Sequence, residues 1–262
     1  MPDISFTIIT SRVELNLPRL EKKDNVSIHR LGLGTPLDKF WLVLRGASYV
    51  GGLKEEKPDL VWAMMASYGG LAALSYKKKN PNIPYLLSLQ EGDDMARLSR
   101  RTFFIEKRFR DIFEKADSVQ AISNYLGKWA KTMARDVPVT IIPNGVDLSA
   151  LPYKFKEMSE PINIISLSRL VYKNGLDTLI RAFALLPKQY ILTLVGSGPL
   201  YNKLKRLSIE LKVEARVYLT GSLSQDKALL SLSHGSIFVR PSRTEGLGNA
   251  FGLFTFDIPC AV

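Results

Sequence analysis

The sequence predicts an α/β protein whose parallel β-sheets are flanked by helices and divided between two Rossmann-like domains. Three observations support this class. Strand-length apolar runs alternate with helix-period segments along the chain, several of these runs are apolar on both faces, and a Pro/Gly break at 143–161 separates two such series. Strands that are apolar on both faces are typical of parallel sheets covered by helices on both sides.

The predicted strands are short runs rich in β-branched or other apolar residues, most of them ended by a turn signal. The run 60–65, for example, follows Pro58-Asp59 and contains only apolar residues. The charged segment 11–25 is expected to be a linker. The strands are expected at 4–10, 26–30, 60–65, 84–89, 117–123, 139–142, 162–167, 190–195, 217–219 and 236–239.

The predicted helices have apolar residues three and four positions apart. Three lysines at 77–79 close one helix at its C-terminal end, where the helix dipole favours cations. Ser123-Asn124 provides an N-cap for another. The helices are expected at 38–49, 67–79, 105–116, 125–134, 176–183, 200–211 and 227–232, with a further one beginning near Gly248.

Composition narrows the class of protein. A length of 262 residues suits one large domain or two of ordinary size. The single cysteine, Cys260, excludes an internal disulfide framework and fits a reducing compartment. No apolar run reaches the roughly 18 to 20 residues that span a bilayer, and the first residues lack a signal-peptide pattern. We therefore expect a cytoplasmic protein.

His29 and His234 lie far apart in the sequence, so no metal site of the zinc type is predicted.

A net charge of +11 favours anionic partners such as nucleotide phosphates, an acidic membrane surface or nucleic acid. Nucleic acid is not expected, because no recognisable motif for it is present. The stretch 97–115 is strongly basic and amphipathic. Two interpretations of it remain open: a helix that contacts the inner face of an anionic membrane, or a helix packed by its aromatic side with a solvated basic side.

The segment 240–249, Arg-Pro-Ser-Arg-Thr-Glu-Gly-Leu-Gly-Asn, follows a predicted strand and precedes a predicted helix. A helix N-terminus suits phosphate, and glycines let the backbone approach a ligand closely. The Glu245 carboxylate suits hydrogen bonds from sugar hydroxyls. An ordinary strand-to-helix turn explains the same pattern.

Ligands of parallel α/β sheets bind at the carboxyl ends of the strands. In the second series, the loops 168–175, 196–199, 220–222 and 241–249 all leave such ends. They bring Arg169, Lys173, Glu245 and several glycines to one cleft, which predicts a phosphate-bearing ligand.

Four motifs follow one another along the chain: Pro143-Asn-Gly-Val-Asp147, Ser168-Arg-Leu-Val-Tyr-Lys-Asn-Gly175, Val195-Gly-Ser-Gly-Pro199 and the segment 240–249. In this order they resemble the motifs of family 4 glycosyltransferases, which have the GT-B fold. The resemblance covers roughly residues 3–251. It implies an acceptor-side domain at 1–148 and a domain at 149–262 that binds a nucleotide-diphosphate sugar. It further implies that both domains are incomplete, the first lacking its initial strand and the second its C-terminal part.

By resemblance, the protein is a retaining hexosyltransferase that uses a UDP- or GDP-sugar, needs no metal or other cofactor, and acts on a glycan or lipid acceptor. Arg169 and Lys173 then contact the donor diphosphate, and Glu245 contacts the donor sugar. The remaining implied residues are Gly198, Gly221, Gly246, Leu247, Gly248 and Asn249 for the donor, and Gln90 and Asp93 for the acceptor side.

The sequence departs from the family pattern at three places. Asn174 stands where the family has the companion lysine of Arg169, and Leu253 stands where it has a second glutamate. Gln90-Glu-Gly-Asp93 replaces an exit that carries a histidine in many relatives. A non-catalytic remnant that binds nucleotide or membrane, or a partner of a complete glycosyltransferase, is therefore an alternative. A dinucleotide-dependent oxidoreductase is disfavoured, because no third glycine follows Gly196-Ser-Gly198 at the expected spacing.

Overall fold

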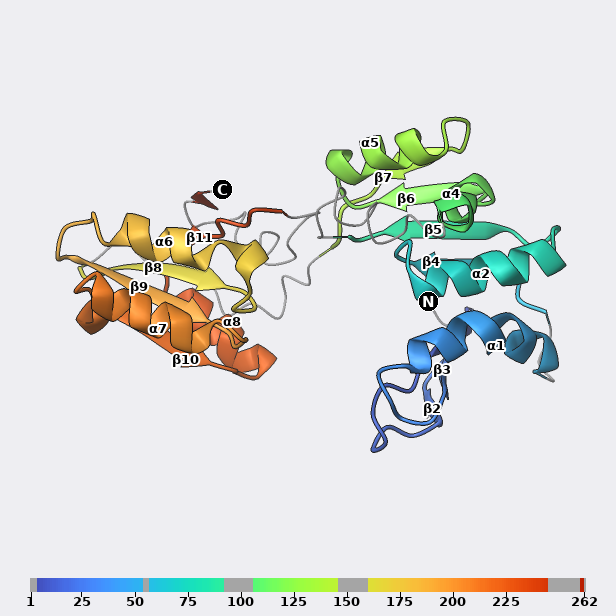
Figure 1. Ribbon diagram of the computed structural model, residues 1–262, viewed down its shortest axis with the longest axis horizontal. Helices are drawn as coiled ribbons and strands as arrows, with labels where there is room; N and C mark the ends of the chain where they lie inside the picture. The colour runs from blue at the N-terminus through green and yellow to red at the C-terminus, as the bar shows by residue number, and fades with distance from the viewer. Residues whose placement is uncertain (1–3, 54–56, 92–105, 146–159, 245–259, 262) are drawn as a thin grey trace. The chain divides into compact units, whose positions relative to one another are not determined.

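The computed structural model describes residues 4–53, 57–91, 106–145, 160–244 and 260–261 (Figure 1). The chain divides into two compact units, one formed by 1–91 and 95–143 and the other by 92–94 and 144–262. In both units the sheets are mainly parallel and flanked by helices, which confirms the predicted fold class.

The N-terminal unit contains two sheets. The first has the order β1-β3-β2, in which β1 (Phe6–Ser11) and β3 (Val26–Leu31) pair in parallel. The second has the order β4-β5-β6-β7 and is parallel throughout. Its strands are β4 (Val61–Met64), β5 (Tyr85–Leu89), β6 (Ser118–Ala121) and β7 (Val139–Ile141).

The charged segment between β1 and β3 is not only a linker, as the sequence had suggested. It contains β2 (Leu20–Lys23), which pairs antiparallel with β3 and is exposed along its whole length. A short, charged edge strand has no buried face, so it shows no apolar alternation that a sequence pattern could reveal.

The helices of this unit are α1 (Asp38–Gly52), α2 (Tyr68–Lys79), α4 (Glu106–Glu114) and α5 (Asn124–Met133). Helix α1 packs on β1, β3 and α2, and α2 packs on β4 and α4. The apolar residues of α4, Phe109, Ile112 and Phe113, are buried, and the Phe113 ring lies 5.0 Å from that of Trp129 in α5. Over 106–114, therefore, the apolar side of the basic stretch is packed inside the protein.

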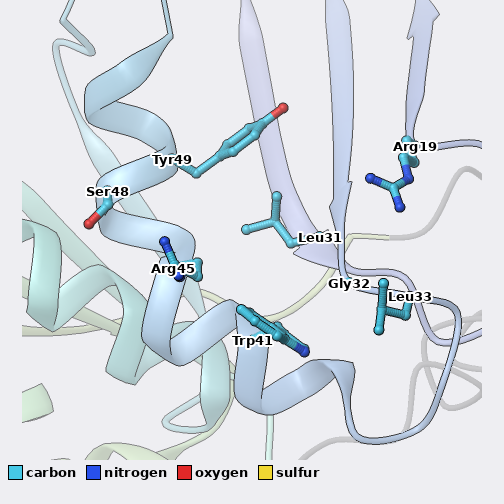
Figure 2. Close-up of a pocket in the computed structure, with 8 residues that line it drawn as sticks. All are labelled: Arg19, Leu31, Gly32, Leu33, Trp41, Arg45, Ser48 and Tyr49. Carbon is cyan, nitrogen blue, oxygen red and sulfur yellow. The ribbon is translucent and has the colours of Figure 1, made fainter.

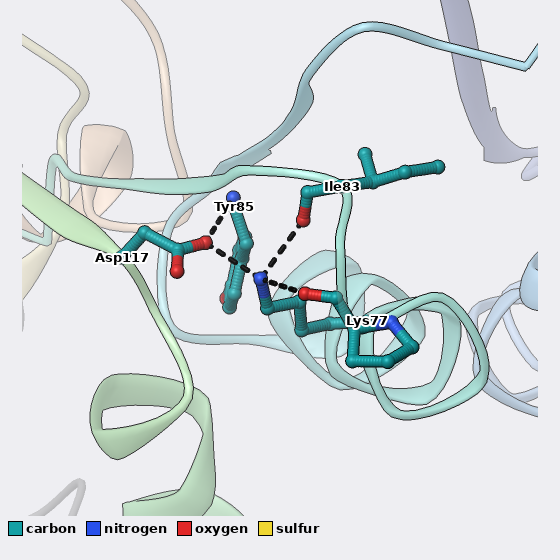
Figure 3. Close-up of polar contacts among 5 residues, drawn as sticks. Lys77, Ile83, Tyr85 and Asp117 are labelled. Carbon is teal, nitrogen blue, oxygen red and sulfur yellow. Dashed lines mark hydrogen bonds and ion pairs between the residues drawn. The ribbon is translucent and has the colours of Figure 1, made fainter.

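The lysines at the end of α2 lie in its last turn, as predicted, and one of them joins three parts of the unit (Figure 3). Lys77 Nζ donates to the carbonyls of Pro81 and Ile83, each at 2.9 Å, and pairs with Asp117 at 2.8 Å. The same Asp117 oxygen accepts the Tyr85 N–H at 2.6 Å. Burial raises the pKa of Asp117, but the hydrogen bonds from Lys77 and Tyr85 outweigh it, so this pKa lies below its usual value.

The C-terminal unit has one parallel sheet of order β10-β9-β8-β11-β12. Its strands are β8 (Ile162–Leu167), β9 (Tyr190–Val195), β10 (Val217–Gly221), β11 (Ile237–Val239) and β12 (Cys260–Ala261). Its helices are α6 (Leu176–Phe183), α7 (Tyr201–Glu210) and α8 (Gln225–Ser233), with the 3-10 turns η2 (Tyr172–Asn174) and η3 (Glu214–Arg216).

Both faces of this sheet are covered. Ile164 belongs to a cluster with residues of α6 and α7, whereas its neighbour Ile165 belongs to a second cluster with Leu232 of α8. Successive residues of a strand point to opposite faces, so α8 lies on the other side of the sheet from α6 and α7. Within the described residues of the whole chain, no helix is both long and apolar enough to cross a bilayer.

Candidate functional site

The strand order of the C-terminal unit fixes where a ligand site is expected. The chain passes from β8 outward to β9 and β10, and then returns to place β11 on the other side of β8. The chain therefore continues from β8 to β9 on one side and from β11 to β12 on the other, in opposite directions along the sheet. This reversal is the topological switch point of an open α/β sheet, and ligands bind in the crevice outside the carboxyl ends of the strands there.

The loops at this point pack so closely that side chains are excluded. Gly175 has φ +65°, and a Cβ on it would overlap the carbonyl oxygen of Pro241. Gly196 has φ +135°, and a Cβ there would overlap the carbonyl oxygen of Ser168. Left-handed backbone and close approach both require glycine. The two glycines thus fix the loop after β8 against the loops after β11 and β9.

Asn174, which replaces the family's companion lysine, has a structural role here. It is buried, and its Nδ2 donates to the carbonyl of Arg169 at 2.6 Å. The Leu170 N–H, next along the loop, donates to the carbonyl of Ser197 at 2.9 Å. Asn174 and Ser197 therefore hold the backbone of the loop. The Arg169 side chain remains exposed and, among the described residues, donates to no protein acceptor.

Arg243, in the loop after β11, connects that loop to the loop after β8. Its backbone N–H donates to the carbonyl of Lys173 at 2.7 Å, and its Nη1 donates to that of Tyr172 at 2.6 Å. Its Nη2 pairs with Asp177 at 2.9 Å and donates to Thr178 at 3.1 Å. The guanidinium also lies over the Tyr172 ring, 4.2 Å from the centroid. The hydrogen bond from Arg243 holds the pKa of Asp177 below its usual value.

Several buried side-chain oxygens around these loops have no hydrogen-bond partner among the described residues. They belong to Ser166, Ser168, Asn174, Asp177 and Ser242. A buried polar group without a partner costs roughly 1–3 kcal/mol, so such groups are nearly always satisfied by protein, water or ligand.

The predicted donor residues are only partly within the described structure. Arg169 and Lys173 lie in the loop after β8, and Gly198 packs against the backbone of Leu170 in that loop. Gly221 ends β10 and pairs with Gly196 through an isolated bridge. Glu245, Gly246, Leu247, Gly248 and Asn249 lie outside the described residues, as does Asp93 of the predicted acceptor side.

The predicted acceptor residue Gln90 follows β5 in the N-terminal unit and is half-buried. Its neighbour Glu91, which the sequence did not single out, is the better-fixed group. Glu91 is buried, and its carboxylate accepts the backbone N–H of Ala66, in the turn between β4 and α2. No local pattern could have shown this contact, because its partners are 25 residues apart.

Within the described ranges, no group of three or more His, Cys, Asp and Glu side chains is arranged to hold a metal ion. The loops at the switch point offer the exposed Arg169, the partly buried Lys173 and tightly turned backbone. This combination suits a ligand that carries phosphate groups.

The fold defines the class as GT-B glycosyltransferase-like. Solved structures share the fold: sucrose-phosphate synthase from Thermosynechococcus elongatus aligns with 97% of this chain and 70% of its own, at a TM-score of 0.79 and 19% identity. HepE from Anabaena, solved in complex with UDP and glucose, aligns with 87% of this chain and 64% of its own, at a TM-score of 0.68 and 18% identity.

Sequence comparison specifies the family. Residues 3–150 match the model of Glycosyltransferase Family 4, and residues 151–251 match that of Glycosyl transferases group 1. The chain belongs to glycosyltransferase family 4.

Individual relatives are more distant. A GDP-mannose-dependent alpha-(1-6)-phosphatidylinositol monomannoside mannosyltransferase of Mycobacterium tuberculosis is 28% identical over 53% of this chain and 40% of its own length. The amylovoran biosynthesis glycosyltransferase AmsK of Erwinia amylovora is 24% identical over 94% of this chain and 60% of its own. The chain thus spans about 40% of the length of the first of these relatives.

Proposed function

We propose that this chain is a retaining hexosyltransferase that takes its sugar from a UDP- or GDP-linked donor and transfers it to a glycan or lipid acceptor. The observation that carries the proposal is the exposed Arg169 side chain, in a loop that glycine contacts fix at the switch point of the sheet. Relatives support the donor class, since one is solved with UDP and glucose and another is named for GDP-mannose.

In this proposal Arg169 and Lys173 bind the donor diphosphate. Departure of a nucleoside diphosphate develops negative charge on its phosphate oxygens, and cationic side chains stabilise that charge without a metal. Gly198 and Gly221 border the donor. Glu245 contacts the donor sugar, and residues 246–249 present backbone N–H groups to the phosphates. On the acceptor side, Gln90 and Asp93 contact the incoming hydroxyl, and Glu91, next to Gln90, is fixed by the backbone N–H of Ala66.

The experiment is donor turnover, measured for UDP-glucose and GDP-mannose by NMR of the released sugar or the product. We expect an α-configured product from these α-linked donors and undiminished turnover in EDTA. Arg169→Ala is expected to lower turnover at least tenfold, whereas Arg181→Ala, which removes an exposed arginine from α6, is expected to leave it unchanged. Nucleotide binding without any turnover would instead identify a non-catalytic nucleotide-binding member of the family.

A further inference from the structure

A cavity of about 440 Å³ lies in the N-terminal unit, where β3 ends and α1 begins (Figure 2). This volume falls in the range of small-molecule sites. Because β3 pairs in parallel with β1, the cavity lies at the carboxyl end of this pair, the edge at which α/β proteins bind ligands. The cavity is lined by Arg19, Leu31, Gly32, Leu33, Trp41, Arg45, Ser48 and Tyr49.

The rim of this cavity is fixed in place by its own hydrogen bonds. The Asp38 carboxylate accepts the backbone N–H groups of Gly34 at 2.6 Å and Thr35 at 3.0 Å. Gly32 has φ +116°, and a Cβ on it would overlap the Asp38 side chain. The exit loop of β3 is thus tied to the first turn of α1, so the cavity is formed before any ligand arrives.

The arginines around the cavity fall into two groups. Arg12 and Arg30 donate to backbone carbonyls of the loop 15–18, so both of them serve to hold that loop. Arg19 and Arg45 line the cavity instead, the first from the residue before β2 and the second from α1 (Figure 2). Among the described residues, neither of these two side chains donates to a protein acceptor.

The charge of these two arginines is not balanced at the cavity. Glu21 pairs with Arg30 at 2.7 Å, and the Asp38 carboxylate is engaged by backbone N–H groups. No aspartate or glutamate is among the described residues that line the cavity. A guanidinium group matches the geometry of a carboxylate or a phosphate, so the cavity favours a ligand that carries one of these groups.

The other polar and aromatic groups of the lining suit a sugar. The Trp41 ring is 42% exposed and is held at the cavity by the Arg45 guanidinium, 5.8 Å from its centroid. Ser48 and Tyr49 contribute hydroxyl groups, and the Tyr49 hydroxyl is fixed by a hydrogen bond of 3.0 Å with Nδ1 of His29. A sugar ring has an apolar C–H face and a rim of hydroxyls, so it matches an open aromatic ring beside hydroxyl groups.

We propose that this cavity binds an acidic sugar of the glycan acceptor, that is, a sugar residue that carries a carboxylate or a phosphate group. Arg19 and Arg45 bind the anionic group, Trp41 packs against the sugar ring, and the hydroxyl groups of Ser48 and Tyr49 meet those of the sugar. A neutral sugar leaves both arginines unused, and a small inorganic anion leaves the aromatic wall unused. The inference rests on the proposed function, since it specifies the class of acceptor.

The test is calorimetric titration of the full chain, without any nucleotide sugar, with digalacturonic acid and with glucose 6-phosphate. The neutral counterparts are the methyl ester of digalacturonic acid and glucose, which lack the charge. We expect an acidic probe to bind at least tenfold more tightly than its neutral counterpart, and the binding to weaken as salt is added. The acidic probe that binds more tightly identifies the anionic group as carboxylate or phosphate.

Two variants test the two parts of the cavity. Arg19→Ala/Arg45→Ala is expected to weaken binding of the acidic probe about ten- to hundredfold, because charge-assisted hydrogen bonds are lost. The control Lys203→Ala/Arg206→Ala removes the same charge from exposed positions of α7 and is expected to bind like the wild type. Trp41→Leu is expected to weaken binding by about threefold to tenfold without changing its salt dependence, because the ring contact is lost and the charge is kept.

Equal losses in the arginine variant and the α7 control would overturn the proposal, because net charge alone would then explain binding. Equally tight binding of acidic and neutral probes would also overturn it, as would inorganic phosphate that binds as tightly as glucose 6-phosphate. A folded protein that binds neither acidic probe would do the same. Since these titrations contain no nucleotide, binding of UDP or GDP that depends on Arg169, without binding of an acidic sugar, would reject this inference and leave the proposed function in place.

Discussion

The carboxyl edges of the two units are built in different ways. In the C-terminal unit, the loops after β8, β9 and β11 touch through backbone, and glycines at 175, 196 and 198 make that contact possible. In the N-terminal unit, the loops after β4 and β5 are joined by a side chain instead, since the Glu91 carboxylate accepts the backbone N–H of Ala66, 25 residues earlier in the sequence.

This difference explains which site the sequence reveals. Where the backbones of two loops touch, only glycine fits at the point of contact. Such contacts therefore produce glycine motifs that can be recognised in the sequence. A side chain that accepts a hydrogen bond from a distant backbone N–H needs only to be a polar residue at the right point in space, so it leaves no local pattern in the sequence. The loop contacts of the C-terminal unit can therefore be recognised in the sequence, whereas those of the N-terminal unit are recognised only in the folded structure.

The largest expected effect comes from breaking the backbone contact of the C-terminal unit. Gly196→Ala places a methyl group against the carbonyl of Ser168 at φ +135°. We expect it to lower the free energy of unfolding by about 3 kcal/mol or more, measured in urea. The matched control is Gly221→Ala, which has φ +74° but no atom within 4 Å of the new methyl, and is expected to cost only about 1–2 kcal/mol. Equal costs would show that close packing does not set the loop.

The next prediction tests whether Arg243 positions the loops for nucleotide binding or only stabilises the fold. Arg243→Ala removes the connection between the loops after β8 and β11, so we expect weaker binding of the donor nucleotide, by about tenfold, with a modest loss of stability. Arg216→Ala is the control, because Arg216 also donates to backbone carbonyls and lies over a ring, that of Phe183, but away from the switch point. It is expected to lower stability and leave nucleotide binding intact. Unchanged binding in Arg243→Ala would assign it a purely structural role.

The smallest effect concerns the N-terminal unit. Lys77→Met removes the pair with Asp117, whose carboxyl is largely exposed, so we expect a loss of about 0.5–1 kcal/mol at neutral pH. The folded-state pKa of Asp117 lies below its unfolded value of about 3.9, so this contribution is complete above that pH and disappears as the pH falls through the folded value. The stability difference between variant and wild type is thus expected to shrink below about pH 4. A difference independent of pH would exclude Asp117 as the partner that matters.

Most strands and helices could be predicted from the periodicity of their apolar residues, because each of them buries an apolar face against a neighbour. The strand β2 could not be predicted in this way, since it has no buried face. The aromatic side of 106–114 illustrates a second limit: the same amphipathic pattern serves a packed helix or a membrane helix, and only the contacts with α5 show that it is packed.

At the candidate site, the glycines and Arg169 were predictable because their motif spacing reflects loop geometry. The roles of Asn174 and Arg243 were not. The buried Asn174 donates to the backbone carbonyl of Arg169, and Arg243 donates to the carboxylate of Asp177, 66 residues earlier in the sequence. In the sequence, an arginine that joins two loops cannot be distinguished from one that is exposed to solvent. The role of Arg243 can therefore be recognised only from its tertiary contacts.

The most direct test of the account is calorimetric titration of UDP and GDP into the full chain, the Arg169→Ala variant and the Arg181→Ala control. A hydrogen-bonded contact to a charged group contributes about 1.5–3 kcal/mol, so we predict saturable binding by wild type and control and roughly ten- to hundredfold weaker binding by Arg169→Ala. A folded protein that binds neither nucleotide, or an Arg169→Ala variant that binds as tightly as the wild type, would contradict a donor site at the β8–β11 switch point.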